Sequence, residues 1–344
     1  MRLFPRGGDQ AAGIGEFWEW WAKTHPELDM LVEEGDIGAI NDKLAPAVAA
    51  VHPSLVWEIS PGRDADQALV VTSAGDPELR SLAHRLALAA PPADARWEYH
   101  PSRQANPAAM ELKIDVAGRE LAFDRLVLGL RVPPGNPRVD VTIYHPIFPD
   151  LGDETRMEAS ILALDWILGE DDVARWIGEI IAATAEPLDA VPAIHLPAVV
   201  ADVATDYAEP QWVLLEGQTQ SGNLLTATAR HPLRPVDHPL FDQHISIALP
   251  YRSSDANGLP TSDSVTALES FENHLTETLT RTPEEAILAA HVTADGARTF
   301  HIYADPTTDT AIRTKSLIPT WQQGRPRMDV TDDPGWLSIS PFLT

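Results

Sequence analysis

The segment AILAAHVTADGARTFHIYAD, residues 286–305, decides the fold of the C-terminal half of the chain. Apolar residues dominate both of its arms, and the short turn ADGA separates them. Glycine is favoured in such turns because it adopts backbone conformations that other residues avoid. We therefore expect two antiparallel strands joined by a tight turn.

The segments around this hairpin predict the rest of an α+β domain. Residues 262–279 have helical periodicity, and one apolar face is made by Val265, Leu268, Phe271, Leu275 and Leu279. A shorter helix is expected at 310–324. Strands are expected at 212–219, 224–230, 244–251 and 325–330. The order β-β-β-α-β-β-α-β contains a βαββαβ core, which is typical of a ferredoxin-like antiparallel sheet with helices on one face.

The N-terminal half predicts a second α+β domain, again an antiparallel sheet with helices packed on one face. In its opening helix, Phe17, Trp20 and Trp21 share one side, so their expected role is to attach the helix to the domain. A ligand-stacking platform on this helix is the alternative, and its candidate residues are Trp18 and Trp21.

The domain boundary is expected in residues 187–211, which are rich in Pro, Ala and Asp and predict a linker. The two domains are then residues 1–186 and 212–344. The last helix before the linker is expected within 154–184, with an interruption at GEDD. Its acidic residues, which include Asp165 and Glu170, are expected on a solvated face.

The bulk composition excludes several classes of function. The chain has 344 residues and no cysteine, so disulfides and cysteine-ligated metal sites are excluded. No signal peptide and no membrane-spanning apolar run is recognisable, and we expect a cytoplasmic protein. The net charge of −26 disfavours nucleic acid and anionic membranes as partners, because both require a basic surface.

The acidic residues are unevenly distributed. Residues 150–209 hold 14 acidic residues against Arg156 and Arg175 only, a net charge of −12. Such a region is explained by solubility alone, or by the docking of a basic protein. Both explanations remain open at this stage.

A family resemblance lies in the C-terminal half. The motifs that carry it, in order, are GLP at 258–260, ALESFENHL at 267–275, AAHVTADGARTFHIYA at 289–304 and DDPGW at 332–336. Together they resemble a bacterial domain-of-unknown-function family, number 695, over about residues 212–342. The matching positions are Gly258, Pro260, Glu269, Glu272, Gly296, Arg298, Phe300, Tyr303, Asp333, Pro334 and Trp336. The resemblance implies a fold and a bacterial origin, and it implies no reaction.

Candidate binding residues follow from these motifs. Glu269 and Glu272 are neighbours on the polar face of their helix, where carboxylates are usually solvated. Arg298 and Tyr303 are polar residues of the hairpin expected at 286–305. We carry all four as candidates for ligand or partner binding.

The segment HPLRPVDHPLFDQH, residues 231–244, is the only candidate metal site. Zinc accepts histidine nitrogens and a carboxylate, and the candidate ligands are His231, His238, His244 and Asp237. Three prolines keep the segment extended. The strand that follows alternates so that His244 should point outward. An exposed loop is therefore the competing interpretation.

No catalytic signature is present: the sequence has no Gly-x-Ser-x-Gly elbow, no Walker loop and no His-Glu-x-x-His. We therefore expect a non-catalytic, acidic protein-binding module without a cofactor, of the regulatory or immunity type, whose partner is a basic protein. The alternative is a metal-dependent hydrolase that uses zinc at residues 231–244. A small-ligand-binding module with the tryptophan-rich helix as its platform is the third hypothesis.

Overall fold

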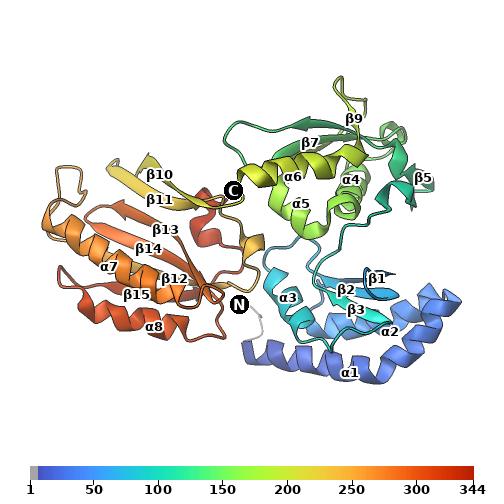
Figure 1. Ribbon diagram of the computed structural model, residues 1–344, viewed down its shortest axis with the longest axis horizontal. Coiled ribbons are helices and arrows are strands. Elements are labelled where there is room, and N and C mark those ends of the chain that lie inside the picture. The colour runs from blue at the N-terminus through green and yellow to red at the C-terminus, as the bar shows by residue number, and fades with distance from the viewer. Residues whose placement is uncertain (1–6) are drawn as a thin grey trace. The chain divides into compact units, whose positions relative to one another are not determined.

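The computed structural model describes residues 7–344, with side chains described from Gln10 onward. The chain divides into two compact units, an N-terminal unit, Met1–Asp206, and a C-terminal unit, Tyr207–Thr344. Both contain helices and sheets, which confirms the predicted α+β class (Figure 1). In the described part of the chain, no helix combines the length and the apolar character needed to span a bilayer.

The first part of the N-terminal unit is a three-stranded sheet with helices packed on it. Its elements are α1 (Gly7–Glu34), α2 (Ile37–Val51), β1 (Val56–Pro61), β2 (Gln67–Thr72), α3 (Arg80–Leu88) and β3 (Trp97–His100). β1 and β2 are antiparallel, whereas β2 and β3 are parallel because α3 carries the chain back between them. The core is apolar and includes Phe17, Trp21, Leu44, Leu82 and Trp97.

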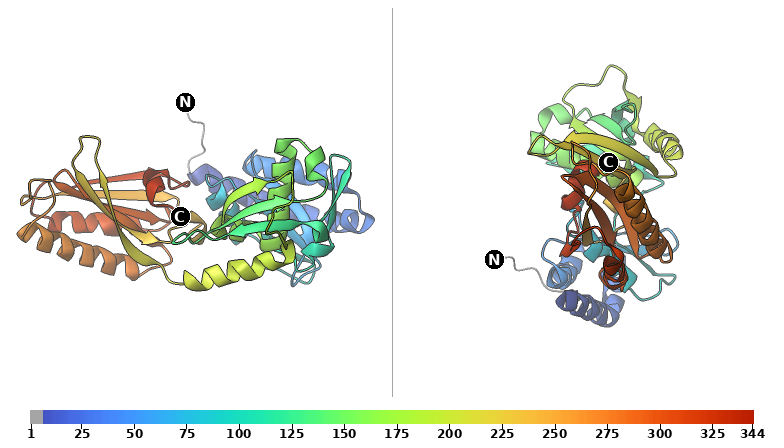
Figure 2. Two further views of the ribbon diagram at one scale, coloured as in Figure 1. Left: turned by 90° about the horizontal axis from the view of Figure 1, so that it is seen from above. Right: turned by 90° about the vertical axis from the view of Figure 1, so that its left-hand side faces the viewer.

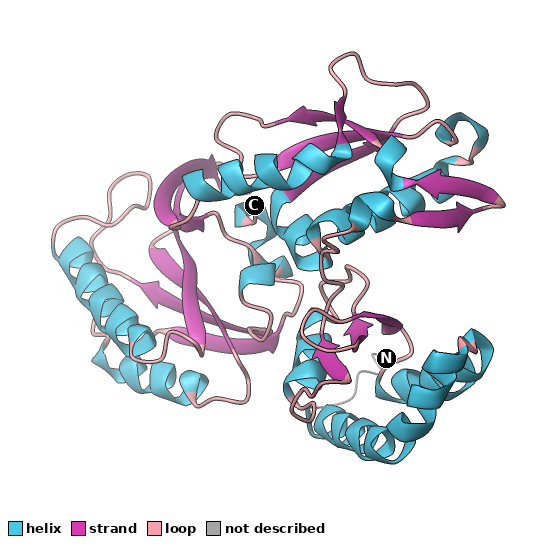
Figure 3. Ribbon diagram, turned by 45° about the vertical axis from the view of Figure 1, so that its right-hand side comes forward, coloured by secondary structure: helices cyan, strands magenta, loops and turns pink. Residues whose placement is uncertain are grey.

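The second part of the N-terminal unit is built around a four-stranded sheet of order β8-β7-β6-β9. Its elements are β4 (Lys113–Val116), β5 (Arg119–Ala122), β6 (Val127–Arg131), β7 (Val139–Tyr144), α4 (Asp153–Leu168), α5 (Glu170–Trp176), β8 (Ile177–Ala182), β9 (Val191–Pro192) and α6 (Leu196–Asp206). Along β7, Val139, Val141 and Ile143 are buried and alternate with half-buried residues. Helices α4 and α6 pack together on one side of this sheet (Figure 3).

Three expectations for this unit differ from the structure. Instead of one antiparallel sheet, the described residues of this unit form three separate sheets. Strands β7 and β8 are parallel because α4 and α5 connect them. The expected helix ends at Trp176, and Ile177–Ala182 is strand β8. The segment expected as a linker, 187–211, contains β9 and α6, and α6 buries Leu196, Val200 and Val203.

The C-terminal unit is one six-stranded antiparallel sheet of order β10-β11-β13-β14-β12-β15. Its elements are β10 (Gln211–Gln218), β11 (Leu224–His231), β12 (Gln243–Pro250), α7 (Asp263–Thr280), β13 (Ala286–Ala294), β14 (Ala297–Ala304), α8 (Thr310–Leu317) and β15 (Arg327–Asp332). This is the predicted order of strands and helices. The name ferredoxin-like remains our interpretation of that order.

Helices α7 and α8 cover one face of this sheet (Figure 2). Their apolar side chains meet those of the central strands, including Leu268, Phe271, Ile245, Ile247 and Phe300. The opposite face is partly covered by the loop after β11 and by the C-terminal 3-10 helix. That second contact buries the large rings of Tyr303 and Trp336, which stack with their centroids 3.9 Å apart.

Candidate functional site

The histidines of residues 231–244 are held apart in the structure. His231 contacts the ring of Tyr207, and His238 stacks between Phe241 and Trp336. Asp237 accepts a hydrogen bond from Arg234 at 3.1 Å. Over the described residues, no group of three or more histidine or carboxylate side chains is arranged to hold a metal ion.

The prediction that His244 points outward is wrong. It is buried, and its Nε2 lies 3.0 Å from Nδ1 of His301 on the neighbouring strand. The reason is the cover over the second face of the sheet, which strand alternation alone does not reveal. Burial, followed by the nearby His244 ring, lowers the pKa of His301 to about 4, so this pair is uncharged at neutral pH.

The two tryptophans proposed as a ligand platform are structural. Trp21 is 1% exposed and donates from Nε1 to the hydroxyl of Tyr99 at 3.1 Å. Trp18 donates to the carbonyl of Leu86 at 2.9 Å. The depression beside Trp18 holds only about 10 Å³, which is the space of a single water molecule. Both indoles are therefore engaged in contacts within the N-terminal unit.

Of the four candidates from the family motifs, three make contacts inside the C-terminal unit and one is exposed. Arg298 donates from Nη1 to Glu272 at 3.1 Å and from Nε to Thr293 at 3.0 Å. Tyr303 donates to Asp333 at 2.6 Å, and Asp333 in turn accepts the backbone N–H groups of residues 337 and 338. Glu269 is exposed. These contacts join α7 to the hairpin and the C-terminal 3-10 helix to the sheet.

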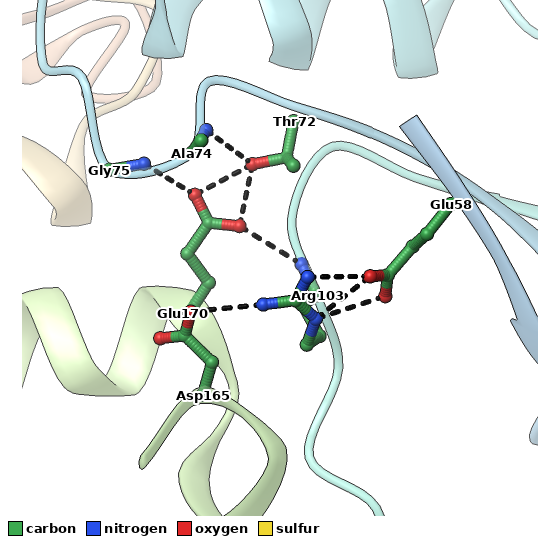
Figure 4. Close-up of polar contacts among 7 residues, drawn as sticks. All are labelled: Glu58, Thr72, Ala74, Gly75, Arg103, Asp165 and Glu170. Carbon is green, nitrogen blue, oxygen red and sulfur yellow. Dashed lines mark hydrogen bonds and ion pairs between the residues drawn. The ribbon is translucent and has the colours of Figure 1, made fainter. Parts of the chain in front are cut away.

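Sequence reasoning missed a polar cluster in the N-terminal unit, shown in Figure 4. Arg103 donates to Glu58 from Nη2 at 2.6 Å and to Asp165 from Nη1 at 3.1 Å. Glu170, 7% exposed, accepts from the Thr72 hydroxyl at 2.6 Å and from the backbone N–H of Gly75 at 2.9 Å. We call these residues, Glu58, Thr72, Arg103, Asp165 and Glu170, the Arg103 cluster.

A glycine between α4 and α5 allows the loop that carries Arg103 to approach these helices closely. Gly169 separates α4 from α5 with a φ of 88°, a conformation that favours glycine. A Cβ atom there would lie 3.1 Å from the backbone nitrogen of Ala105 and 3.3 Å from the carbonyl of Arg103. The loop at 103–105 can therefore lie directly against the break, where the N–H of Glu170 donates to the carbonyl of Arg103 at 2.9 Å.

The Arg103 cluster holds three carboxyl groups against one guanidinium, so the buried site has an excess of acid. Burial raises the pKa of Asp165 to about 7, although Arg103 opposes the shift. The cluster links β1 and β2 to α4 and α5 through hydrogen bonds to every carboxyl group. Its chemistry is that of a structural contact with one carboxyl group that titrates near neutral pH.

A depression of about 410 Å³ lies against the four-stranded sheet, over residues of β6, β7 and β8 and of the loop after β8. We call it the acidic groove. Its lining residues are Gly129, Leu130, Arg131, Asp140, Val141, Thr142, Glu179, Ile181, Pro187, Leu188 and Asp189. Gly129 lets the loop after β8 approach the sheet, because a Cβ atom there would meet Pro187 at 3.2 Å.

The acidic groove combines exposed apolar side chains with unpaired carboxylates. Ile181 is 47% exposed and Leu188 is fully exposed. Arg131 donates to Asp140 at 2.6 Å, so the one cation of the groove is already neutralised. Within the described residues, the side chains of Glu179 and Asp189 have no ion-pair partner. The groove therefore offers an apolar surface and two free negative charges.

Comparison with protein-family models matches residues 225–344 to DUF695, a family of unknown function. The match confirms the resemblance inferred from the motifs of the C-terminal half, and it begins within β11. No curated protein and no solved structure matches the chain. The matched family carries no assigned activity, so functional inference rests on the residues themselves.

Proposed function

We propose that this chain is a non-catalytic protein-binding module, of the regulatory or immunity type, that acts in the cytoplasm. Its partner is a basic protein, and the contact is a cationic, partly apolar segment that occupies the acidic groove. The observation that carries this proposal is the groove itself, where exposed Ile181 and Leu188 lie beside the unpaired carboxylates of Glu179 and Asp189.

The charge around the groove supports a cationic occupant. In residues 150–209, ten of the fourteen acidic side chains are exposed: Asp150, Asp153, Glu154, Glu158, Glu179, Glu186, Asp189, Asp202, Asp206 and Glu209. Two of these ten are paired, Asp150 with Arg119 at 3.0 Å and Asp153 with Arg156 at 2.7 Å. The region keeps a net charge of −12, which favours the approach of a positive segment.

The apolar part of the groove supports a protein segment rather than a free cation. Covering an exposed leucine or isoleucine side chain stabilises a complex by about 1.5–3 kcal/mol. Carboxylates at the edge of such a contact chiefly set the rate of association and the choice of partner. A segment that alternates basic and apolar side chains satisfies both parts of the groove.

The hydrolase alternative has weaker support. It requires the imidazoles of residues 231–244 to converge, and they contact separate neighbours in the described structure. The binding proposal requires no convergence of catalytic groups.

The test is a binding titration with a defined probe. A fluorescent peptide of alternating lysine and leucine is titrated with the full chain, and its anisotropy is measured from about 50 to about 500 mM NaCl. We expect binding that weakens with salt, and a loss of affinity of about tenfold or more in the double variant E179K/D189K.

The matched control is E34K/E78K. It makes the same change in charge at two exposed positions of the same unit outside residues 150–209. Its affinity for the peptide should stay within about threefold of that of the original chain, because salt screens charges that lie far from the bound peptide. Equal losses in the two double variants, or no binding to the original chain, would overturn the proposal.

A further inference from the structure

Strand β10 is an exposed edge of the six-stranded sheet. It pairs with β11 over all eight of its residues, and no strand formed by residues 7–344 lies on its other side. Figure 1 shows it at the margin of the sheet. An edge strand presents unpaired backbone N–H and C=O groups, which can pair with another chain.

The side chains of β10 are unusually apolar for an exposed edge. Trp212, Leu214 and Leu215 are 46%, 67% and 41% exposed. The strand sequence QWVLLEGQ contains no lysine, arginine or proline, which are the residues that commonly protect free edges from pairing. The edge therefore lacks the usual barriers to strand addition.

The charge around β10 favours a second copy of the chain as the partner that pairs with this edge. Between Gln211 and His231 the hairpin carries one acid, Glu216, and one base, Arg230, so it is locally neutral. The whole chain has a net charge of −26, so two copies repel each other over most of their surface. They meet least repulsion at this hairpin, whereas a basic partner finds no excess of negative charge here.

We infer that two copies of the chain pair through the free edges of β10, in antiparallel orientation about a two-fold axis. The two six-stranded sheets then form one continuous sheet across the dimer. A two-fold axis at Leu214 places Leu214 opposite its own copy and Val213 opposite Leu215. It also places Glu216 opposite Trp212, so the two acidic side chains do not face each other.

Arg230 contacts the Trp212 side chain at this edge and fixes its position. Its guanidinium lies 5.3 Å from the centroid of the Trp212 ring, while its Nε donates to the carbonyl of Leu288 at 2.9 Å. The indole is therefore positioned against the sheet before a second copy arrives. Pre-positioned aromatic side chains lose little conformational freedom on association.

The test is the mass of the full chain in solution. In sedimentation velocity at about 100 µM we expect a species of twice the 37.5 kDa chain mass, and dissociation upon dilution. The variant L214K/L215K should be monomeric at the same concentration, because it places four like charges along the paired edges. The matched control I37K/I312K changes two other exposed side chains and should remain dimeric.

A cysteine variant gives a second measurement that does not depend on the charge reversal. The natural chain has no cysteine, so L214C introduces one thiol at the inferred axis. Directly opposed residues of antiparallel strands have Cβ atoms about 4.5–5.5 Å apart, which is close enough for a disulfide after a small adjustment. Oxidation of L214C should therefore yield a cross-linked dimer, while I312C should yield none. A monomeric original chain, a dimer that persists in L214K/L215K, or an L214C chain that does not cross-link would each overturn the inference.

Discussion

The Arg103 cluster and the acidic groove draw on the same acidic stretch of sequence and use it in opposite ways. Asp165 and Glu170 are buried and satisfied by hydrogen bonds. Glu179 and Asp189, which follow within twenty residues of Glu170, face solvent beside apolar side chains. In the cluster, carboxyl groups stabilise the unit. In the groove, they are free to attract a partner. A count of charges along the chain does not separate these two roles, because the difference arises only when the helices pack.

The largest expected effect on stability comes from removing the Arg103 side chain from the cluster. R103A leaves Glu58 and Asp165 without their guanidinium partner. We therefore expect the free energy of unfolding to fall by about 3–5 kcal/mol. The exposed pair of Lys113 and Glu120 in the same unit is the matched control, and K113A should cost less than about 1 kcal/mol. Urea unfolding followed by circular dichroism measures both. Similar losses in the two variants would mean that the cluster contributes no more than a surface pair.

A second, smaller effect tests the protonation of the cluster. The pKa of Asp165 is about 7 in the folded state, compared with 3.8 for an exposed aspartate, because burial disfavours the charged form. The folded chain therefore holds a proton that the unfolded chain has lost, and this contribution to stability declines as pH rises from about 4 to about 7.

The variant D165N isolates this contribution because its side chain stays neutral at every pH. Between pH 5 and pH 8 we expect the stability of D165N relative to the original chain to rise by roughly 2–3 kcal/mol. Urea unfolding at several pH values provides the comparison. Parallel pH profiles for the two proteins would show that Asp165 is charged in the folded state at pH 5.

The smallest effect concerns the groove and is seen in binding only. Leu188 is fully exposed, so L188A should change the free energy of unfolding by less than about 0.5 kcal/mol. The same variant should weaken binding of the lysine–leucine peptide by about 1 kcal/mol, or roughly fivefold, because its side chain is covered only in the complex. The control L337A removes another exposed leucine, and its affinity should be unchanged. If L188A binds as tightly as the control, the peptide does not use the groove.

Periodicity predicted the C-terminal unit well. The hairpin of β13 and β14, helix α7 and the order of strands follow from the alternation and helical spacing of their apolar residues. The N-terminal unit was less predictable, because α4 is buried on several sides. Leu164 and Leu168 are buried, while Ile161, which has helical spacing from both, is 41% exposed. A helix without one clear apolar face gives little indication of which of its acids face solvent.

The candidate sites were less predictable than the fold. Arg103 lies in an irregular loop, and its three carboxyl partners come from residues 58, 165 and 170. No spacing in the sequence brings such distant residues together. The GEDD interruption was the one available signal, because its glycine has the backbone conformation that permits the loop contact. Residues 231–244 illustrate the opposite error, in which closeness along the chain suggested a site whose side chains have separate neighbours.

The most direct test of the central claim is hydrogen–deuterium exchange of the full chain with and without the lysine–leucine peptide. The binding proposal predicts slower exchange in the segments that line the acidic groove, at residues 129–131, 140–142 and 179–189, and unchanged exchange along α7. Protection confined to other segments, or no protection at saturating peptide, would contradict the claim that the groove receives a basic partner.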